Sequence, residues 1–195
     1  VDHGIVAVEQ TKYASEKLGF EVIITDHHTI GKKLPKALAI VHTTQLAGSG
    51  VSWFLAQEII KYYSSNPSTT LGINSVRSSL PIKSGSNNTN LDLAALGTIA
   101  DLVPLQGPNR SIVKFGLEEI HQTKRVGLLA LTREAGLLKE NVETYEVSYI
   151  LAPRLNALGR IDNALDALRL LCTSDAVKSA RLARRLNEVN GERQK

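Results

Sequence analysis

The sequence predicts an α/β fold in which a parallel sheet flanked by helices is followed by a mostly helical part and a long final helix. One observation is the β-branched run at 20–25, which follows an amphipathic stretch at 4–18 and is bounded by Gly19. A run rich in Val and Ile that directly follows a helix is typical of a buried parallel strand. The other observation is that apolar residues recur at helical spacing from residue 91 onward.

The first half of the chain supplies the predicted sheet. Residues 1–2 are expected to be the last residues of a strand. Together with the helix at 4–18 and the strand at 20–25, they predict a βαβ unit with a right-handed crossover. A further strand is expected at 37–41, and Gly48-Ser49-Gly50 opens a helix that runs to about residue 63. A glycine turn at a helix start exposes backbone N–H groups suited to an anion. Tight packing of the turn explains the same residues at least as well.

The second half is predicted to be helical. Residues 64–90 are rich in Ser, Asn, Thr, Gly and Pro, which indicates a surface insertion. Residues 91–105 are almost wholly apolar or small, and a helix that is apolar all round is buried. Further helices are expected at 111–121, 126–136, 145–150, 162–171 and 175–194, with Asp162 and Asp175 as N-caps.

Size and composition limit the class of protein. With 195 residues the chain holds one ordinary α/β domain with a sizeable core. No run approaches the ~20 apolar residues of a membrane span, so no membrane partner is expected. Cys172 is the only cysteine, which excludes an intramolecular disulfide and predicts a cytoplasmic location. The formal net charge of +4 is compatible with a nucleic-acid partner without establishing one.

Titratable side chains gather where the strand at 20–25 ends. Asp26, His27 and His28 follow its apolar residues, and open α/β sheets bind their ligands at the carboxyl ends of strands. Asp2 ends the neighbouring predicted strand and is expected to face the same site. A carboxylate beside two imidazoles suits a divalent metal such as zinc, manganese or iron. Because side chains alternate along an extended segment, the two histidines are expected to have different roles. A polar loop whose histidines bond to backbone carbonyls is the alternative.

Two other places carry candidate chemistry. Asp101 lies near the end of the apolar helix, where an isolated buried charge costs several kcal/mol, so we expect it to be paired or to bind a metal. A structural cap or ion pair is equally consistent with that position. Arg154, Asn156 and Arg160 lie in a stretch punctuated by Pro and Gly that is predicted to be a loop. Two arginines flanking an Asn can bind phosphate, although solvated surface arginines are commoner.

Four separated patterns together resemble one known family. They are Asp2-His3-Gly4, Asp26-His27-His28, LDLAALGTIADLVPL at 91–105 and PRLNALGR at 153–160. In combination they resemble the DHH phosphoesterase superfamily, and the last two patterns make the chain similar to its single-strand-specific exonucleases. The resemblance covers essentially the whole chain apart from the insertion. It implies a DHH catalytic domain at 1–173, carrying the insertion at about 64–90, and a connector helix at 174–195 that leads toward a second domain.

The resemblance also implies a function and a set of site residues. It implies a 5′–3′ exonuclease that hydrolyses phosphodiester bonds of single-stranded DNA in repair and recombination, with two Mn²⁺ or Mg²⁺ ions. Single-stranded DNA is the implied partner, and repair proteins are candidate partners. The implied metal ligands are Asp2, His27 and Asp101. The implied catalytic residues are His28, which faces the scissile phosphate, and Asp26, which orients an imidazole. The implied nucleic-acid contacts are Arg154, Asn156 and Arg160.

The sequence departs from the family pattern at both ends. An Asp-x-Asp motif of a preceding strand would lie upstream of Val1, and the second domain would lie downstream of Lys195. Because the chain also contains no Met, we expect it to be a fragment of a longer protein. His42-Thr43 stands where relatives commonly have Asn-Pro. Two alternatives stay open: a DHH phosphoesterase acting on short oligonucleotides, phosphoadenosine phosphate or cyclic dinucleotides, and a non-catalytic DNA-binding scaffold.

Overall fold

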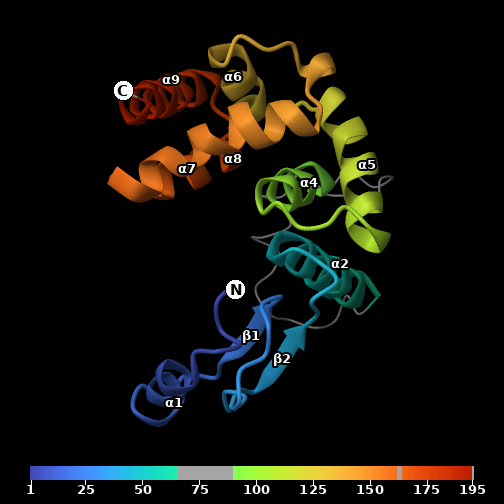
Figure 1. Ribbon diagram of the computed structural model, residues 1–195, viewed down its shortest axis with the longest axis vertical. Helices are drawn as coiled ribbons and strands as arrows, with labels where there is room; N and C mark the ends of the chain where they lie inside the picture. Colours follow the sequence, from blue (N-terminus) through green and yellow to red (C-terminus); the bar gives the residue numbers. More distant parts are fainter. Residues whose placement is uncertain (66–89, 162–163, 195) are drawn as a thin grey trace.

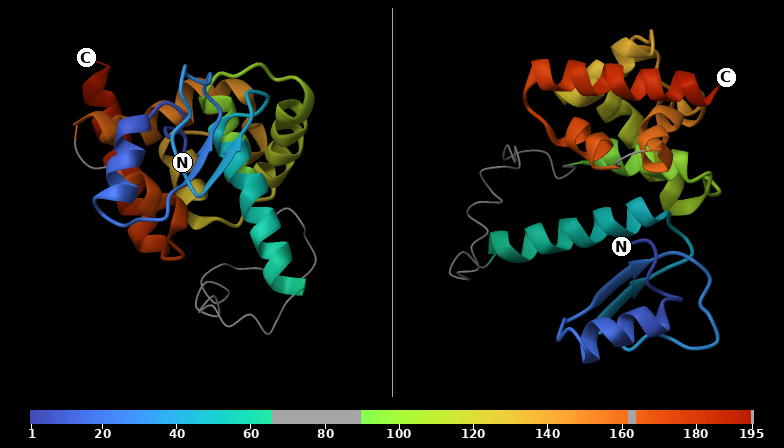
Figure 2. Two further views of the ribbon diagram at one scale, coloured as in Figure 1. Left: turned by 90° about the horizontal axis from the view of Figure 1, so that it is seen from below. Right: turned by 90° about the vertical axis from the view of Figure 1, so that its left-hand side faces the viewer.

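The fold is known from a computed structural model, which describes residues 1–65, 90–161 and 164–194. Nearly all of the insertion predicted at 64–90, and the N-cap predicted at Asp162, lie outside the described residues. Figure 1 shows a small α/β part near the N-terminus and a larger helical part, and Figure 2 shows helix α2 (Gly48–Ser65) between them. The predicted α/β class with a parallel sheet is confirmed.

The sheet in the described residues has two parallel strands, β1 (Ile23–Asp26) and β2 (Ala39–His42). Their register pairs Asp26 with His42, so both strands end at the same level. In Figure 1 both arrowheads point toward α2. The carboxyl ends of the strands therefore meet beside that helix.

The segment before β1 differs from the prediction. Residues 1–2 are not a strand, although the Asp2 N–H donates to the Thr25 carbonyl at 2.7 Å. The φ of Asp2 is 61°, in the left-handed region, which is incompatible with the extended geometry of a strand. Helix α1 (Val8–Glu16) is shorter than the predicted 4–18. It ends before Gly19, whose φ of 70° is one that glycine adopts without steric cost.

Three helices connect the sheet to the helical part. Helix α2 begins at Gly48 as predicted and packs against α4 (Leu91–Ala100), which packs in turn on α5 (Gly107–His121). The crossing of α2 and α4 is tight, because a Cβ built on Gly97 would lie 2.6 Å from the Ser49 Cβ. Helix α4 is buried over most of its length, as its apolar sequence predicts.

The C-terminal part is helical, as predicted. Its elements are α6 (Val126–Glu134), the 3-10 turn η1 (Lys139–Asn141), the π-helical η2 (Glu146–Leu151), α7 (Ala152–Ile161), α8 (Leu165–Cys172) and α9 (Ala176–Arg193). The N-cap predicted at Asp175 is confirmed, since its side chain accepts hydrogen bonds from the N–H groups of Val177 and Lys178. No helix in the described part of the chain is long and apolar enough to cross a membrane.

The loop predicted around 152–160 is wrong, because this stretch forms helix α7 in direct continuation of η2. Pro153 has no N–H to donate, and it follows the wider π turn of η2, where an irregular hydrogen-bonding pattern is already present. Leu151 and Ala157 are fully buried and hold the segment on the core. Tertiary packing therefore overrides the helix-breaking composition.

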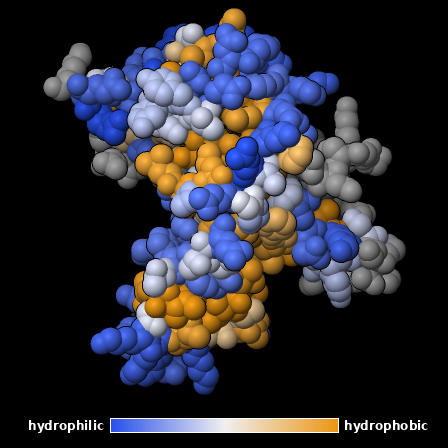
Figure 3. Space-filling view, turned by 45° about the vertical axis from the view of Figure 1, so that its right-hand side comes forward, coloured by the Kyte–Doolittle hydropathy of each residue, from blue (hydrophilic) through white to orange (hydrophobic). Residues whose placement is uncertain are grey.

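The hydrophobic core lies in the helical part. Its main cluster runs from α4 to α9 and includes the fully buried Ile120, Leu131 and Leu186. The small sheet adds less, since Ile24 is buried but Ile23 is exposed. Figure 3 shows apolar surface on the lower part of the molecule, where Figure 1 places the sheet and α1. The core thus supports α4 directly and the sheet mainly through α2.

Candidate metal centre

Acidic and imidazole side chains from three segments meet at the carboxyl end of β1. Asp26 is the last residue of this strand, and His27 and His28 follow it. Asp2 is held beside Thr25 by its backbone hydrogen bond, and Asp101 is the C-cap of α4. One donor atom each from Asp2, His27 and His28 lie within 4.8 Å of one another. The structure therefore brings Asp2 and the histidines together, as predicted.

His27 lies between two carboxylates. Its Nε2 is 3.1 Å from Asp2 Oδ1 and 3.5 Å from Asp101 Oδ2. This buried nitrogen nevertheless has no hydrogen-bond partner, a situation that costs about 1–3 kcal/mol when nothing else satisfies the atom.

Asp2 Oδ1 and Asp101 Oδ2 each lie at the distance of a neighbouring ligand from His27 Nε2, although the donor atoms that all lie within 4.8 Å of one another come from Asp2, His27 and His28. Ligands at 2.0–2.1 Å from an octahedral Mg²⁺ lie about 3 Å apart when they are neighbours, close to the spacing around His27 Nε2. One imidazole and two carboxylates form a mixed donor set compatible with Mn²⁺ among other divalent ions. Asp2 and His27 could therefore share a divalent metal, with Asp101 as a further carboxylate beside His27.

Asp26 is a fully buried carboxylate that organises the strand end. Its Oδ2 accepts from the Ile5 N–H at 2.7 Å, and its Oδ1 accepts from the His27 N–H at 2.7 Å. The same Oδ1 lies 2.7 Å from His28 Nδ1. Burial raises the pKa of Asp26, but the donated hydrogen bonds from Ile5, His28 and His27 outweigh it and hold the pKa far below its usual value. Asp26 is therefore an ionised anchor, not a group open to a ligand.

His28 faces outward from this anchor. Its side chain is 52 % exposed, and the hydrogen bond to Asp26 raises the pKa of the imidazole. The ring centroids of His27 and His28 are only 4.4 Å apart, so the two side chains do not point to opposite sides. The alternation expected from strand geometry fails because β1 ends at Asp26. Their surroundings still differ: His27 faces two acids, and His28 is bound to Asp26 through Nδ1.

Two residues near the site were not among the predicted site residues. His42 Nε2 donates to the His28 carbonyl oxygen at 2.7 Å, which links the end of β2 to the histidine loop. A Cβ built on Gly48 would collide with the Asp2 carboxylate. Both positions stand out in the sequence, one as a departure from Asn-Pro and the other as a glycine at a helix start. Their spatial relation to Asp2 and His28 could not be derived from it.

Asp101 is more exposed than its apolar neighbours led us to expect. Its side chain is 40 % exposed, because α4 ends at Ala100 and the chain turns through Leu102, whose φ is 56°. The prediction of a buried charge is wrong. The carboxylate nevertheless lies close to His27, so the expected pairing is present.

The three residues expected to contact nucleic acid are on or near α7. Arg154 donates from Nε to Asn187 Oδ1 at 2.9 Å and from Nη1 to the Ile150 carbonyl at 2.7 Å, so its guanidinium links α7 to α9 and η2. Desolvation lowers its pKa. Asn156 is exposed. Arg160 lies in α7, but its side chain is outside the described part of the structure.

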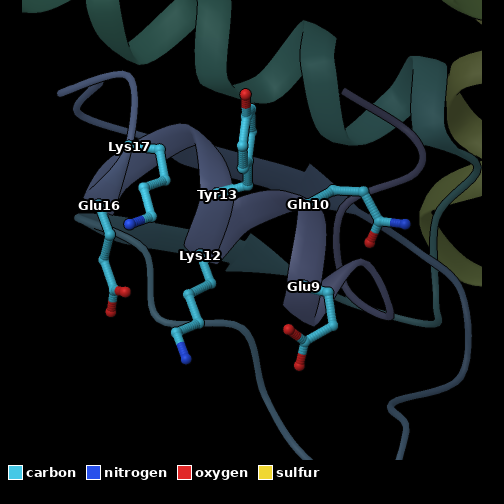
Figure 4. Close-up of a pocket in the computed structure, with 6 residues that line it drawn as sticks. All are labelled: Glu9, Gln10, Lys12, Tyr13, Glu16 and Lys17. Atoms are coloured by element: carbon cyan, nitrogen blue, oxygen red, sulfur yellow. The ribbon is translucent and has the colours of Figure 1, made fainter.

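A recess of about 530 Å³ lies away from these residues, on the outer side of α1. Figure 4 shows its side chains spreading from one helix and its C-cap, with Tyr13 pointing opposite to Glu9 and Lys12. The lining residues are Glu9, Gln10, Lys12, Tyr13, Glu16 and Lys17. None of them belongs to the candidate metal centre.

The sequence was compared with models of known protein families. The sequence model of the DHH family, N-terminal domain, matches residues 1–98. The chain belongs to the DHH family. The match includes Asp2, the Asp26-His27-His28 triplet and most of α4, but it stops before Asp101.

This DHH-family chain is similar to curated exonucleases over its whole length. It is 42 % identical over 206 residues to the single-stranded-DNA-specific exonuclease RecJ of Bacillus subtilis, and 37 % identical over 201 residues to that of Thermus thermophilus. These alignments cover 100 % of the chain but 23 % and 27 % of the two relatives. The chain thus spans about a quarter of their length.

Solved structures of RecJ share the fold of this DHH-family chain. The structure of RecJ in complex with Mn²⁺ from Thermus thermophilus aligns with a TM-score of 0.76 and 36 % identity, covering 100 % of this chain and 27 % of that one. A second structure, of exonuclease RecJ bound to manganese, aligns with a TM-score of 0.75 and 34 % identity, covering 100 % and 46 %. The predicted DHH fold is confirmed.

Proposed function

We propose that this chain is the catalytic part of a metal-dependent exonuclease that hydrolyses phosphodiester bonds of single-stranded DNA from the 5′ end. The observation that carries the proposal is the buried His27 Nε2, which lies between the carboxylates of Asp2 and Asp101 but makes no hydrogen bond. The named activity of the RecJ relatives supplies the substrate class. DNA repair and recombination are the processes that such an activity serves, and repair proteins remain candidate partners.

Asp2, His27 and Asp101 would hold Mn²⁺ or Mg²⁺, consistent with the manganese in the similar RecJ structures. A bound divalent ion stabilises charge that develops on a phosphodiester and lowers the pKa of a coordinated water. The contribution of the chain is to fix the two carboxylates about one imidazole nitrogen. The start of α2, whose N–H groups carry partial positive charge, lies against the Asp2 carboxylate.

His28 would act on the substrate phosphate, with Asp26 holding its ring in position. The ionised Asp26 accepts from Nδ1–H and fixes the orientation of the ring, which is a positioning role. The exposed His28 would then donate from Nε2 to a phosphate oxygen as negative charge develops there. The predicted DNA contact of Asn156 is compatible with its exposure. Arg154 is already engaged with α9 and η2, so we assign it to holding α7 in place.

The test is release of nucleotides from a 5′-labelled single strand by the full-length protein, with and without Mn²⁺. His27→Ala is expected to reduce cleavage by at least 100-fold, since it removes the central ligand. His3→Ala, at an exposed histidine next to Asp2, is the matched control and is expected to retain activity. Near-normal cleavage by His27→Ala would overturn the proposal.

The same assay separates the alternatives. For a strand-processing exonuclease, long single strands compete with hydrolysis of a dinucleotide, whereas a small-substrate phosphoesterase is indifferent to them. Tight strand binding without any metal-dependent cleavage would instead indicate a non-catalytic scaffold.

A further inference from the structure

A basic recess lies between α8 and α9, and none of its residues belongs to the candidate metal centre. Its volume is about 640 Å³. The lining residues are Asp166, Arg169, Lys178, Arg181, Leu182 and Arg185. Four cations thus surround one carboxylate in a chain whose formal net charge is only +4. The described lining of this recess therefore carries more positive than negative charge.

Asp166, the acid among the described residues that line this recess, holds two of the arginines in place. Asp166 is buried, and its Oδ1 accepts from Arg169 Nη1 at 2.8 Å while its Oδ2 accepts from Arg185 Nη1 at 2.9 Å. The side chains of Arg169 and Arg185 are still 55 % and 49 % exposed. Both guanidinium groups are therefore held by Asp166, while their side chains remain about half-exposed. Such fixed guanidinium groups lose less conformational entropy when they bind an anion.

Three of the four cations of the recess form a row along α9. Lys178, Arg181 and Arg185 have the spacing i, i+3, i+7, which places them on one face of the helix. Like charges on one helix face repel each other, and an anion bound beside them lowers this repulsion. At the N-cap, hydrogen bonds from the N–H groups of Lys178 and Val177, and to a smaller extent the charges of Lys178 and Arg181, lower the pKa of Asp175. The row therefore creates a field that favours anions.

We propose that this recess binds phosphate groups of the DNA backbone and forms a strand-binding site separate from the metal centre. The proposal rests on the proposed function, since single-stranded DNA is the phosphate-bearing ligand of that activity. None of the described residues that line the recess is aromatic, so these side chains offer no surface for base stacking. Binding is expected to be independent of base sequence and steeply dependent on salt.

The experiment measures binding of a fluorescent oligo(dT) strand to the full-length protein without divalent metal, at several salt concentrations. The variant is Lys178→Ala with Arg181→Ala. The matched control is Lys12→Ala with Lys17→Ala, which removes two exposed lysines at the recess on α1 and changes the net charge equally. The variant is expected to bind about tenfold more weakly than the control. Its slope of log K against log salt is expected to be about 1.4 units shallower, for two lost contacts at ~0.7 each.

Equal binding by variant and control would overturn the proposal. It would show that strand affinity depends on the net charge of the protein and not on the cations of this recess. Thermal unfolding of both variants checks that the fold is retained, and Arg181→Glu provides a second variant with a larger expected loss. A dinucleotide is too short to reach both the metal centre and this recess, so its cleavage is expected to be unchanged in the variant. If the parent cleaves nothing but loses strand binding with this variant, the proposed function fails while the phosphate site stands.

Discussion

Gly48 leaves room for the Asp2 carboxylate at the start of α2. Alanine at this position would push aside the end of a flexible, half-exposed side chain, not the backbone. We expect Gly48→Ala to weaken Mn²⁺ binding about tenfold, the size typical for groups that support a ligand. Little change in thermal stability is expected, and calorimetric titration of the metal measures the effect. Gly191→Ala, where the added Cβ meets nothing within 4 Å, is the control. Unchanged Mn²⁺ affinity in Gly48→Ala would contradict this role of Asp2.

His42 supports the loop that carries His28. Its hydrogen bond to the His28 carbonyl is lost in His42→Ala, so we expect nuclease activity to fall about tenfold. His42→Gln keeps an N–H donor and is expected to restore part of the activity. Steady-state cleavage of a single strand at saturating Mn²⁺ measures both. Full activity in His42→Ala would show that this hydrogen bond does not position His28.

At the residue scale, the sequence predicted which groups gather but not how each is used. The Asp26-His27-His28 triplet and Asp2 could be placed together because parallel strands end at one edge of a sheet. Which of the two histidines faces the acids depends on the residue at which β1 ends. If the strand ended one residue earlier or later, the two histidines would exchange sides. The exposure of Asp101 depends on the turn after α4, which its apolar sequence did not indicate.

At the scale of elements, helices α2 and α4 pack closely against each other because Gly97 has no side chain. A Cβ on Gly97 would lie 2.6 Å from the Cβ of Ser49, and neither helix backbone can move without disturbing the core. Gly97→Ala is therefore expected to lower the free energy of unfolding by about 1–3 kcal/mol, measured in urea. Gly191→Ala, in an open helical position, is expected to be neutral or slightly stabilising. Equal stability of the two variants would contradict the tight crossing.

The N-cap of α9 predicts a pH dependence of stability. Hydrogen bonds from the Lys178 and Val177 N–H groups hold the pKa of Asp175 below its usual value. A carboxylate with a lowered folded-state pKa stabilises fully above its unfolded pKa of about 3.9, and this stabilisation is lost as pH falls through the folded pKa. Asp175→Asn keeps a capping oxygen that does not titrate.

We therefore expect the stability difference between the parent and Asp175→Asn to shift in favour of the variant between about pH 5 and pH 3. Urea unfolding of both proteins at each pH measures this difference, and other titrating groups cancel in it. A difference independent of pH would show that the Asp175 carboxylate does not cap α9 as an anion.

At the element scale, sequence patterns predicted most helices and both observed strands. The failures lie at residues 1–2 and at 152–160. One hydrogen bond to Thr25 is not enough to make a strand of residues 1–2, and the left-handed φ of Asp2 could not be seen in the sequence. Pro and Gly indicated a loop at 152–160, but burial of Leu151 and Ala157 stabilises a helix there.

In the whole molecule, the sheet places the candidate site and the helices supply most of the core. The sequence predicted both parts, but it could not show that buried apolar area would be concentrated between α4 and α9. Helix α4 connects the two, since it packs in the core and carries Asp101 at its end. The geometry of the metal centre therefore depends on how α4, α2 and β1 are held together.

The central claim is that Asp2, His27 and Asp101 hold one catalytic divalent ion. Its most direct test is titration of the full-length protein with Mn²⁺, with the free ion measured by electron paramagnetic resonance. The parent is expected to bind Mn²⁺ with at least 100-fold higher affinity than His27→Ala at this site, while His3→Ala binds as the parent does. Equal Mn²⁺ affinity in the parent and His27→Ala would contradict the claim.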